Sequence, residues 1–378
     1  DSLALFYAAT GEQLVLNSDS LFEKAVKDGV YLFDQDQASI VFSGLSTKPV
    51  VSLLRNFSAP VNLEFNYTDE ELAFLIQYET NGFNQWQATQ TLLERILLNG
   101  HDAHIYIQAI KNTLPDLVEQ DPLLASRLFD VPSEGYLGSR IDTDYEPAKI
   151  QEQRNTLIDK LARELGEFCK DTYLALDPDL QKEFSQAMGV RALKNIMLSM
   201  MARQGDETAF ELAYQQYEAT GNMSERLGAL RVLVWNDAPQ AEAALHDFYQ
   251  RFKDEALSLD QWFTLQAAHP CATEDTIQYL TSHVDYDLGV PNRIRSVSGG
   301  LNANPVNTWS FGVDHFIGLA KYLDEKNPIV GSRLLQVLSR WYTLAEPQRS
   351  EVKAKLEALK PQVKSKNVSE TLSSMLSI

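Results

Sequence analysis

The feature that most constrains this chain is a change of hydrophobic periodicity at Thr68. Before it, short β-branched and aromatic runs separated by turn residues predict strands of a β-sandwich. After it, apolar residues recur at helical spacing almost to residue 378, and short loops join the helices that they predict. Helices of this kind bury their apolar faces by stacking in antiparallel pairs. The sequence therefore predicts a mainly α fold, an irregular α-solenoid of armadillo- or HEAT-like helix pairs preceded by a small, incomplete β-sandwich.

The two regimes define two domains, residues 1–67 and residues 68–378. Six strands are predicted in the first, at 2–7, 13–16, 30–33, 39–42, 50–54 and 61–67. A complete β-sandwich of this type commonly takes roughly 100 residues. We therefore expect further strands upstream of residue 1, and an unpaired sheet edge where they are missing.

Capping chemistry marks several helix starts. Thr68 and Glu71 have the spacing of a capping box, and Asn327-Pro328 fits an N-cap followed by proline at N1. Four short helices are predicted to begin near residues 206, 224, 239 and 258, the last through a second capping box made by Ser258 and Gln261. The run SGG at 298–300 predicts a turn instead.

The charge balance bears on the choice of partners. With 33 basic and 52 acidic residues the formal net charge is −19, which argues against nucleic acid and anionic membranes as partners. No apolar run approaches the roughly 20 residues that a membrane helix needs. The two cysteines, Cys169 and Cys271, imply no disulfide framework, so a reducing, cytoplasmic location is expected.

Catalytic motifs are missing from the sequence. His101 and His104 form a His-Asp-Ala-His pair without a third or fourth metal ligand nearby, and we interpret them as a polar helix start. The acidic run at 142–146 lacks the glycine and distant glutamate of a calcium loop, and its charge fits the start of the helix at Pro147. No nucleophile elbow, phosphate loop or dinucleotide fingerprint occurs. We expect this chain to contain no catalytic residue and to bind no metal.

Arginines near the C-terminal end are the exception. Arg293 and Arg295 lie two apart on a short predicted helix, so they point to different faces, and one can be structural while the other faces a cavity. Arg333 and Arg340 flank the apolar stripe of a later helix. The alternative, left open by composition, is ion pairing of these arginines with the chain's own surplus carboxylates.

Five segments carry a resemblance to a known family. They are RNFSAPV at 55–61, NGFNQW at 81–86, DQWFTLQA at 260–267, PNRIRS at 291–296 and NPIVGSR at 327–333. In this order and spacing they resemble the C-terminal region of bacterial aminopeptidase N, a zinc metallopeptidase of the alanyl aminopeptidase type. The chain departs from the family at Gly82 and Gln85, in the segment 297–326, and at Ile329.

The resemblance implies a function for the intact protein. It would be a zinc-dependent aminopeptidase that removes N-terminal residues from peptides, with its zinc ligands and catalytic domain upstream in the same polypeptide. This chain would then hold most of the β-sandwich and the whole helical domain, which in the family closes over the catalytic domain and limits substrate access. The family points the residues matching Arg295 and Arg333 into the enclosed cavity. The alternative hypothesis is a free-standing helical-repeat scaffold that binds a protein partner.

Overall fold

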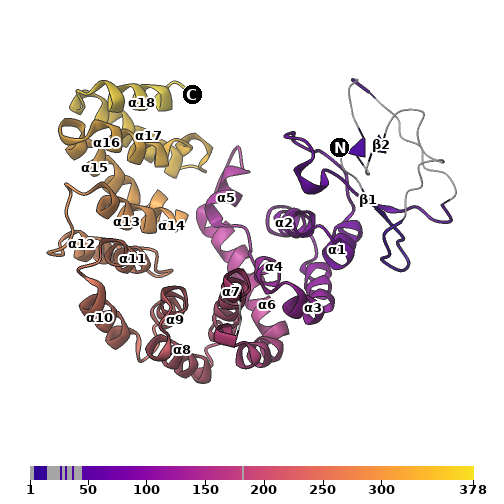
Figure 1. The fold of residues 1–378 in the computed structure, drawn as a ribbon. Coiled ribbons are helices and arrows are strands. Elements are labelled where there is room, and N and C mark those ends of the chain that lie inside the picture. The colour runs from indigo at the N-terminus through magenta and orange to yellow at the C-terminus, as the bar shows by residue number, and fades with distance from the viewer. Residues whose placement is uncertain (1–3, 15–25, 28–29, 32–35, 38–44, 181–182) are drawn as a thin grey trace. The chain divides into compact units, whose positions relative to one another are not determined.

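The computed structural model describes residues 4–14, 26–27, 30–31, 36–37, 45–180 and 183–378 (Figure 1). The chain divides into two compact units. Unit 1 comprises Asp1–Pro132 and Glu164–Ile196, and unit 2 comprises Ser133–Arg163 and Met197–Ile378. Two long helices, α6 (Pro147–Ala175) and α7 (Phe184–Ala202), each contribute residues to both units.

The β segment of unit 1 contains two antiparallel pairs among the described residues. β1 (Ala4–Phe6) pairs with β4 (Val50–Ser52), with Leu5 opposite Val51, and β2 (Val26–Lys27) pairs with β3 (Val30–Tyr31). All of β1 is buried, and the ring of Phe6 packs edge-on against Phe74 of α1 at 6.2 Å. Three of the expected strands are therefore present in shortened form, and the strand at 39–42 lies outside the described residues.

The strand expected at 61–67 is wrong. Residues 62–67 belong to no helix or strand and pair with no strand among the described residues, and Val61, Leu63 and Phe65 are exposed. The carbonyl oxygen of Tyr67 instead accepts a hydrogen bond from Arg95 Nη1 at 2.8 Å. Alternation of apolar side chains identifies extended backbone, but a strand also needs a neighbour with which to exchange hydrogen bonds.

Unit 1 continues with helices that pack around the buried face of α1. The capping box at its start is confirmed, because Thr68 Oγ1 accepts from Glu71 N at 3.1 Å and Glu71 Oε2 accepts from Thr68 N at 2.9 Å. Leu72, Leu75 and Ile76 form the buried face, against which α2 and α3 pack. The helical elements that lie wholly in this unit are η1 (Arg55–Phe57), α1 (Asp69–Tyr78), α2 (Gly82–Asn99), α3 (Ala103–Gln120), α4 (Pro122–Arg127) and η2 (Pro178–Leu180).

Unit 2 is a succession of helices, each packed on near neighbours in sequence, as the solenoid prediction requires (Figure 1). The main contacts join α8 to α9, α11 to α13, and α16 to both α15 and α18. The four short helices begin within two residues of the expected positions. The elements of unit 2 are α5 (Glu134–Ser139), α8 (Glu207–Ala219), α9 (Met223–Trp235), α10 (Ala241–Phe252), α11 (Ala256–Ala267), α12 (Glu274–Thr281), α13 (Pro291–Asn302), α14 (Pro305–Trp309), α15 (Gly312–Lys326), α16 (Pro328–Leu335), η3 (Gln336–Leu338), η4 (Trp341–Thr343), α17 (Gln348–Leu359), η5 (Lys360–Gln362) and α18 (Lys366–Leu376).

Two local predictions in unit 2 are wrong. α11 begins before Ser258, whose hydroxyl lies within the first turn and donates to Glu255 Oε2 at 3.4 Å, so no capping box forms there. The SGG run lies inside α13 rather than in a turn. A Cβ on Gly300 would stand 2.7 Å from Ala267 Cβ and 2.8 Å from the carbonyl oxygen of Thr264. This glycine therefore allows α13 to approach α11 closely, which local turn statistics cannot reveal.

Candidate functional site

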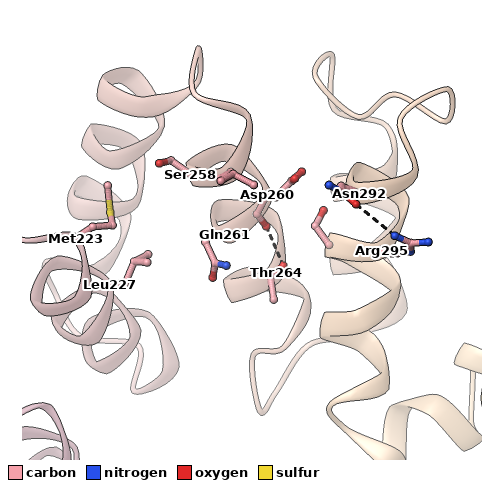
Figure 2. A pocket seen from close by; sticks show the side chains of 10 residues that line it. Met223, Leu227, Ser258, Asp260, Gln261, Thr264, Asn292 and Arg295 are labelled. Atoms are coloured by element: carbon pink, nitrogen blue, oxygen red, sulfur yellow. Dashed lines mark hydrogen bonds between the residues drawn. The ribbon is translucent and has the colours of Figure 1, made fainter. Parts of the chain in front are cut away.

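An open groove in unit 2 lies along helices α9, α11 and α13 (Figure 2). Its volume is about 470 Å³. Figure 2 shows Met223 and Leu227 of α9 on one side, Asn292 and Arg295 of α13 on the other, and Thr264 of α11 between them. The groove thus combines an apolar edge with a polar edge that carries one arginine.

Arg293 is not among the residues that line this groove, and its contacts are structural. Its side chain is 8% exposed, its Nε donates to Asp260 Oδ1 at 2.7 Å, and its Nη1 donates to the carbonyl oxygen of Asp285. The guanidinium also stacks over Phe263, with its carbon 5.0 Å from the ring centroid. These contacts lock α13 onto α11, so Arg293 has no free donor face to offer a ligand.

Arg295, two residues further along α13, has a different environment. Its side chain is exposed and lines the groove, and its Nη1 donates a long hydrogen bond of 3.4 Å to Asn292 Oδ1 (Figure 2). It forms no ion pair with any residue that the structure describes. The spacing argument, which sends residues two apart to different faces, therefore separates a buried anchor from an exposed charge on this helix.

Arg333 and Arg340 differ in the same way. Arg333 lies in the last turn of α16, where it is exposed and makes no ion pair within the described part of the chain. Arg340 donates from Nη2 to the carbonyl oxygen of Ile141 at 2.8 Å and lies 3.7 Å from Asp142 Oδ1. The alternative of ion pairing with the chain's own carboxylates thus explains Arg293 and, in part, Arg340. It does not explain Arg295 or Arg333. Arg333 is not among the residues that line the groove of Arg295.

A larger hollow, of about 700 Å³, lies in unit 1 along α1, α2 and α3. Glu79, Asp116 and Asp121 line it, and none of its lining residues is basic. The fully buried carboxylate of Glu79 accepts from Arg55 Nη2 at 2.8 Å through Oε1, while its Oε2 has no partner within the described residues. This hollow is acidic, which makes it unsuited to the carboxylate end of a peptide.

Segments that carry the family resemblance contact one another through polar side chains: in unit 1, Asn81 Nδ2 of the second segment donates to Asn56 Oδ1 of the first at 2.7 Å. Arg55, in the first segment, also donates to Thr80, and Asn84 in the second donates to the carbonyl oxygen of Leu53 at 2.7 Å. In unit 2, Asp260 of the third segment pairs with Arg293 of the fourth. Gln85, a departure from the family, donates to the carbonyl oxygen of Ile76. Many residues in these segments therefore hold neighbouring parts of the fold together and do not mark a ligand site.

Other candidates from the sequence are engaged in local structure. His101 Nδ1 lies 2.5 Å from Asp69 Oδ2, and Asp102, between the two histidines, is the N-cap of α3. Within the described ranges, no group of three or more His, Cys, Asp and Glu side chains could hold a metal ion. The described residues therefore do not fit a zinc site, and no chemical step is assigned to them.

One histidine that sequence reasoning did not single out is half-buried in unit 2. His315 of α15 lies 3.3 Å, through Nε2, from the hydroxyl of Ser298 on α13. Burial lowers the pKa of His315 to about 4, so the ring is neutral at physiological pH. A helical pattern places such a residue on a partly buried face, but only the packing of α13 against α15 removes it from water.

Comparisons with known proteins place the chain in a family. Residues 69–377 match the family described as "Domain of unknown function (DUF3458_C) ARM repeats". The chain belongs to this family. Residues 2–66 match a second one, "Domain of unknown function (DUF3458) Ig-like fold". The predicted solenoid and the Ig-like character of the β segment agree with these descriptions.

Curated relatives carry the name aminopeptidase N. The chain is 29% identical over 340 residues to that of Escherichia coli (strain K12), a match that covers 86% of this chain and 39% of the relative. It is 29% identical to that of Caulobacter vibrioides, covering 92% of this chain and 42% of the relative, and 26% identical to that of Haemophilus influenzae, covering 94% and 42%. The chain thus spans about two fifths of these relatives' length, in their C-terminal part, and the predicted resemblance to this region is confirmed.

A solved structure confirms the fold. Legionella pneumophila aminopeptidase A, crystallised in complex with aspartic acid, matches with a TM-score of 0.82 and 24% identity, over 99% of this chain and 45% of that chain. No helix among the described residues is long and apolar enough to cross a membrane.

Proposed function

We propose that this chain is the substrate-restricting, non-catalytic part of a zinc-dependent aminopeptidase that acts on peptides in the cytoplasm. The observation that carries this proposal is the pattern of coverage: the aminopeptidase N relatives match nearly all of this chain in their C-terminal part, with more than half of their length left over. On this reading the zinc ligands and the catalytic residues belong to an upstream domain of the same polypeptide.

The proposed division of labour follows the two-domain prediction. Residues 1–67 form part of an Ig-like sandwich, and residues 68–378 form the helical domain that encloses the cavity above the catalytic domain. The family matches at 2–66 and 69–377 support this boundary. Peptide substrates and the upstream catalytic domain are the partners in this proposal, with no nucleic acid and no membrane.

The test is a comparison of this chain with the polypeptide of the full reading frame. The chain 1–378 should contain no stoichiometric zinc by metal analysis and should not hydrolyse a fluorogenic aminoacyl arylamide. The full-length protein should contain zinc and should hydrolyse this substrate. Zinc together with turnover in the 1–378 chain would refute the division of labour. A reading frame without an upstream His-Glu-x-x-His motif would favour the free-standing scaffold instead.

Arg295 and Arg333 are the proposed cavity residues. Both are exposed and neither has a carboxylate partner among the described residues, so each guanidinium is available to the carboxylate or carbonyl groups of a peptide. In the full-length protein, Arg295→Ala and Arg333→Ala should raise KM with little change in kcat, and more for longer peptides than for arylamides. Arg349→Ala, which removes a half-buried arginine paired with Glu346, is the control. An unchanged KM for both substrate types would leave the two arginines without this role.

A further inference from the structure

A smaller hollow in unit 2 has a lining that sets it apart from the rest of this acidic chain. Its volume is about 310 Å³, and it lies among α5, α14 and residues 337–343. Twelve residues line it, and although the chain has 52 acidic residues, none of the twelve is Asp or Glu. Arg340 is the one charged residue among them. The lining therefore favours an anionic ligand.

Arg340 has donor capacity that the protein leaves unused. Nη2 donates to the carbonyl oxygen of Ile141 at 2.8 Å, which fixes the position of the guanidinium. Nε is buried without a hydrogen-bond partner, and Nη1 has no acceptor among the residues that the structure describes. The nearby Asp142 is 94% exposed and lies 3.7 Å from Nη2, beyond hydrogen-bond distance. A planar guanidinium fork with free donors matches the two oxygens of a carboxylate.

Tyr145 supplies a second donor to the same hollow. Its backbone is held by Thr343, because Tyr145 N donates to the carbonyl oxygen of Thr343 at 2.8 Å. Gly138 of α5 leaves room for the ring, since a Cβ there would stand 2.7 Å from the phenol oxygen. The hydroxyl meets no acceptor within the described ranges, and burial raises the pKa of Tyr145, so it remains a protonated donor at neutral pH.

The remaining wall combines uncharged polar residues with an apolar part. Pro305, Trp309 and Val337 contribute the apolar part, and the side chain of Trp309 is almost fully buried. A volume of this size lies at the small end of ligand pockets, which commonly measure about 300–1,000 Å³. An inorganic anion would leave the apolar part of the wall without contacts, so the lining favours a ligand with a short apolar group beside its charge.

We propose that this hollow binds the carboxylate of an amino acid or peptide end that carries an apolar side chain, with Arg340 and Tyr145 as the donors. The site lies wholly within unit 2 and does not depend on peptidase activity, so it goes beyond the proposed function. A free amino acid and the last residue of a peptide present the same carboxylate, and the experiment below distinguishes them.

The test is calorimetric titration of the full-length protein with four probes: N-acetylphenylalanine, its primary amide, phenylalanine and inorganic phosphate. N-acetylphenylalanine should bind with one equivalent, and the amide, which lacks the charge, should bind at least about tenfold more weakly. Equal binding of phenylalanine identifies the carboxylate and side chain as sufficient, whereas its failure to bind identifies a peptide end. Equal affinity for acid and amide, or binding of phosphate alone, overturns the proposal.

Two variants connect the binding to the hollow. Arg340→Ala should weaken N-acetylphenylalanine at least about tenfold, with Arg349→Ala as the charge-matched control. Because Arg340 also holds the Ile141 carbonyl, Tyr145→Phe provides an independent test: it removes only a hydroxyl without a protein acceptor and should weaken binding about three- to tenfold. Wild-type affinity in a folded Tyr145→Phe protein, or equal affinity in the Arg340 and Arg349 variants, overturns the assignment.

Discussion

The hollow of unit 1 and the groove of unit 2 share a construction and differ in charge. In each, an arginine that is largely shielded from solvent pairs with a carboxylate that lines the hollow: Arg55 with Glu79 in unit 1, and Arg293 with Asp260 in unit 2. The edges differ, because unit 1 adds two further acids to its hollow and unit 2 adds Arg295. The pair is therefore a joint between elements, and the exposed residues beside it decide which ligands the surface attracts.

The largest expected effect comes from breaking the joint of unit 2. Arg293→Ala leaves Asp260, which is 15% exposed, without its counter-charge, and should lower the free energy of unfolding by about 3–5 kcal/mol. Arg295→Ala, two residues away on the same helix, should change it by less than about 0.5 kcal/mol. Urea denaturation followed by circular dichroism measures both. A similar loss of unfolding free energy in the two variants would contradict the assignment of Arg293 as a structural residue and Arg295 as an exposed charge.

The half-buried His315 of unit 2 should make that unit acid-sensitive. The pKa of His315 is lowered from 6.5 to about 4 in the folded state, so between these values the unfolded chain binds a proton that the folded chain does not. Stability is therefore complete above about pH 6.5 and falls as the pH decreases towards 4, by at most about 3 kcal/mol. His315→Gln should flatten this part of the stability profile, whereas His104→Gln, at an exposed position of unit 1, should leave it unchanged.

A smaller effect tests the close approach of α11 and α13, which holds the groove together. Gly300→Ala places a Cβ 2.7 Å from Ala267 Cβ and should cost about 1–3 kcal/mol through overpacking. Gly299→Ala is the matched control, because a Cβ there meets nothing within 4 Å. That substitution should stabilise the helix by roughly 0.5–1 kcal/mol. If the thermal unfolding midpoint shifts in the same direction for both variants, the close contact of residue 300 with α11 does not determine the effect of the substitution.

The smallest effect on stability should accompany a change in surface charge. Arg295→Glu gives the groove of unit 2 the acidic character of the unit 1 hollow, and its exposed position should keep the change in unfolding free energy within about 0.5 kcal/mol. The variant full-length protein should show a higher KM for peptides with an acidic C-terminal residue, most clearly at low ionic strength. If the variant has the same KM as the unmodified protein at both low and high salt concentration, this charge has no role in attracting substrate.

Local chemistry alone determined much of the fold. The capping box of Thr68 and Glu71, and the N-cap made by Asn327 before Pro328, appear as predicted, because each involves atoms only a few residues apart. The starts of the four short helices were found within two residues; side-chain caps explain this for α8 and α9, which begin after Asp206 and Asn222, but not for α10 and α11. Helical periodicity was likewise sufficient to identify the mainly α architecture.

Only the tertiary structure decided the questions that depend on residues far apart in the chain. The segment at 61–67 pairs with no strand among the residues that the structure describes, and Gly300 lies in α13 where Ala267 of α11 approaches it closely. Arg293 and Arg295 look alike in sequence, and the position of Asp260 makes the first an anchor and leaves the second exposed. Likewise, Arg340 and Tyr145 reach one hollow although nearly 200 residues separate them, since packing energies depend on distance in space rather than on distance along the chain.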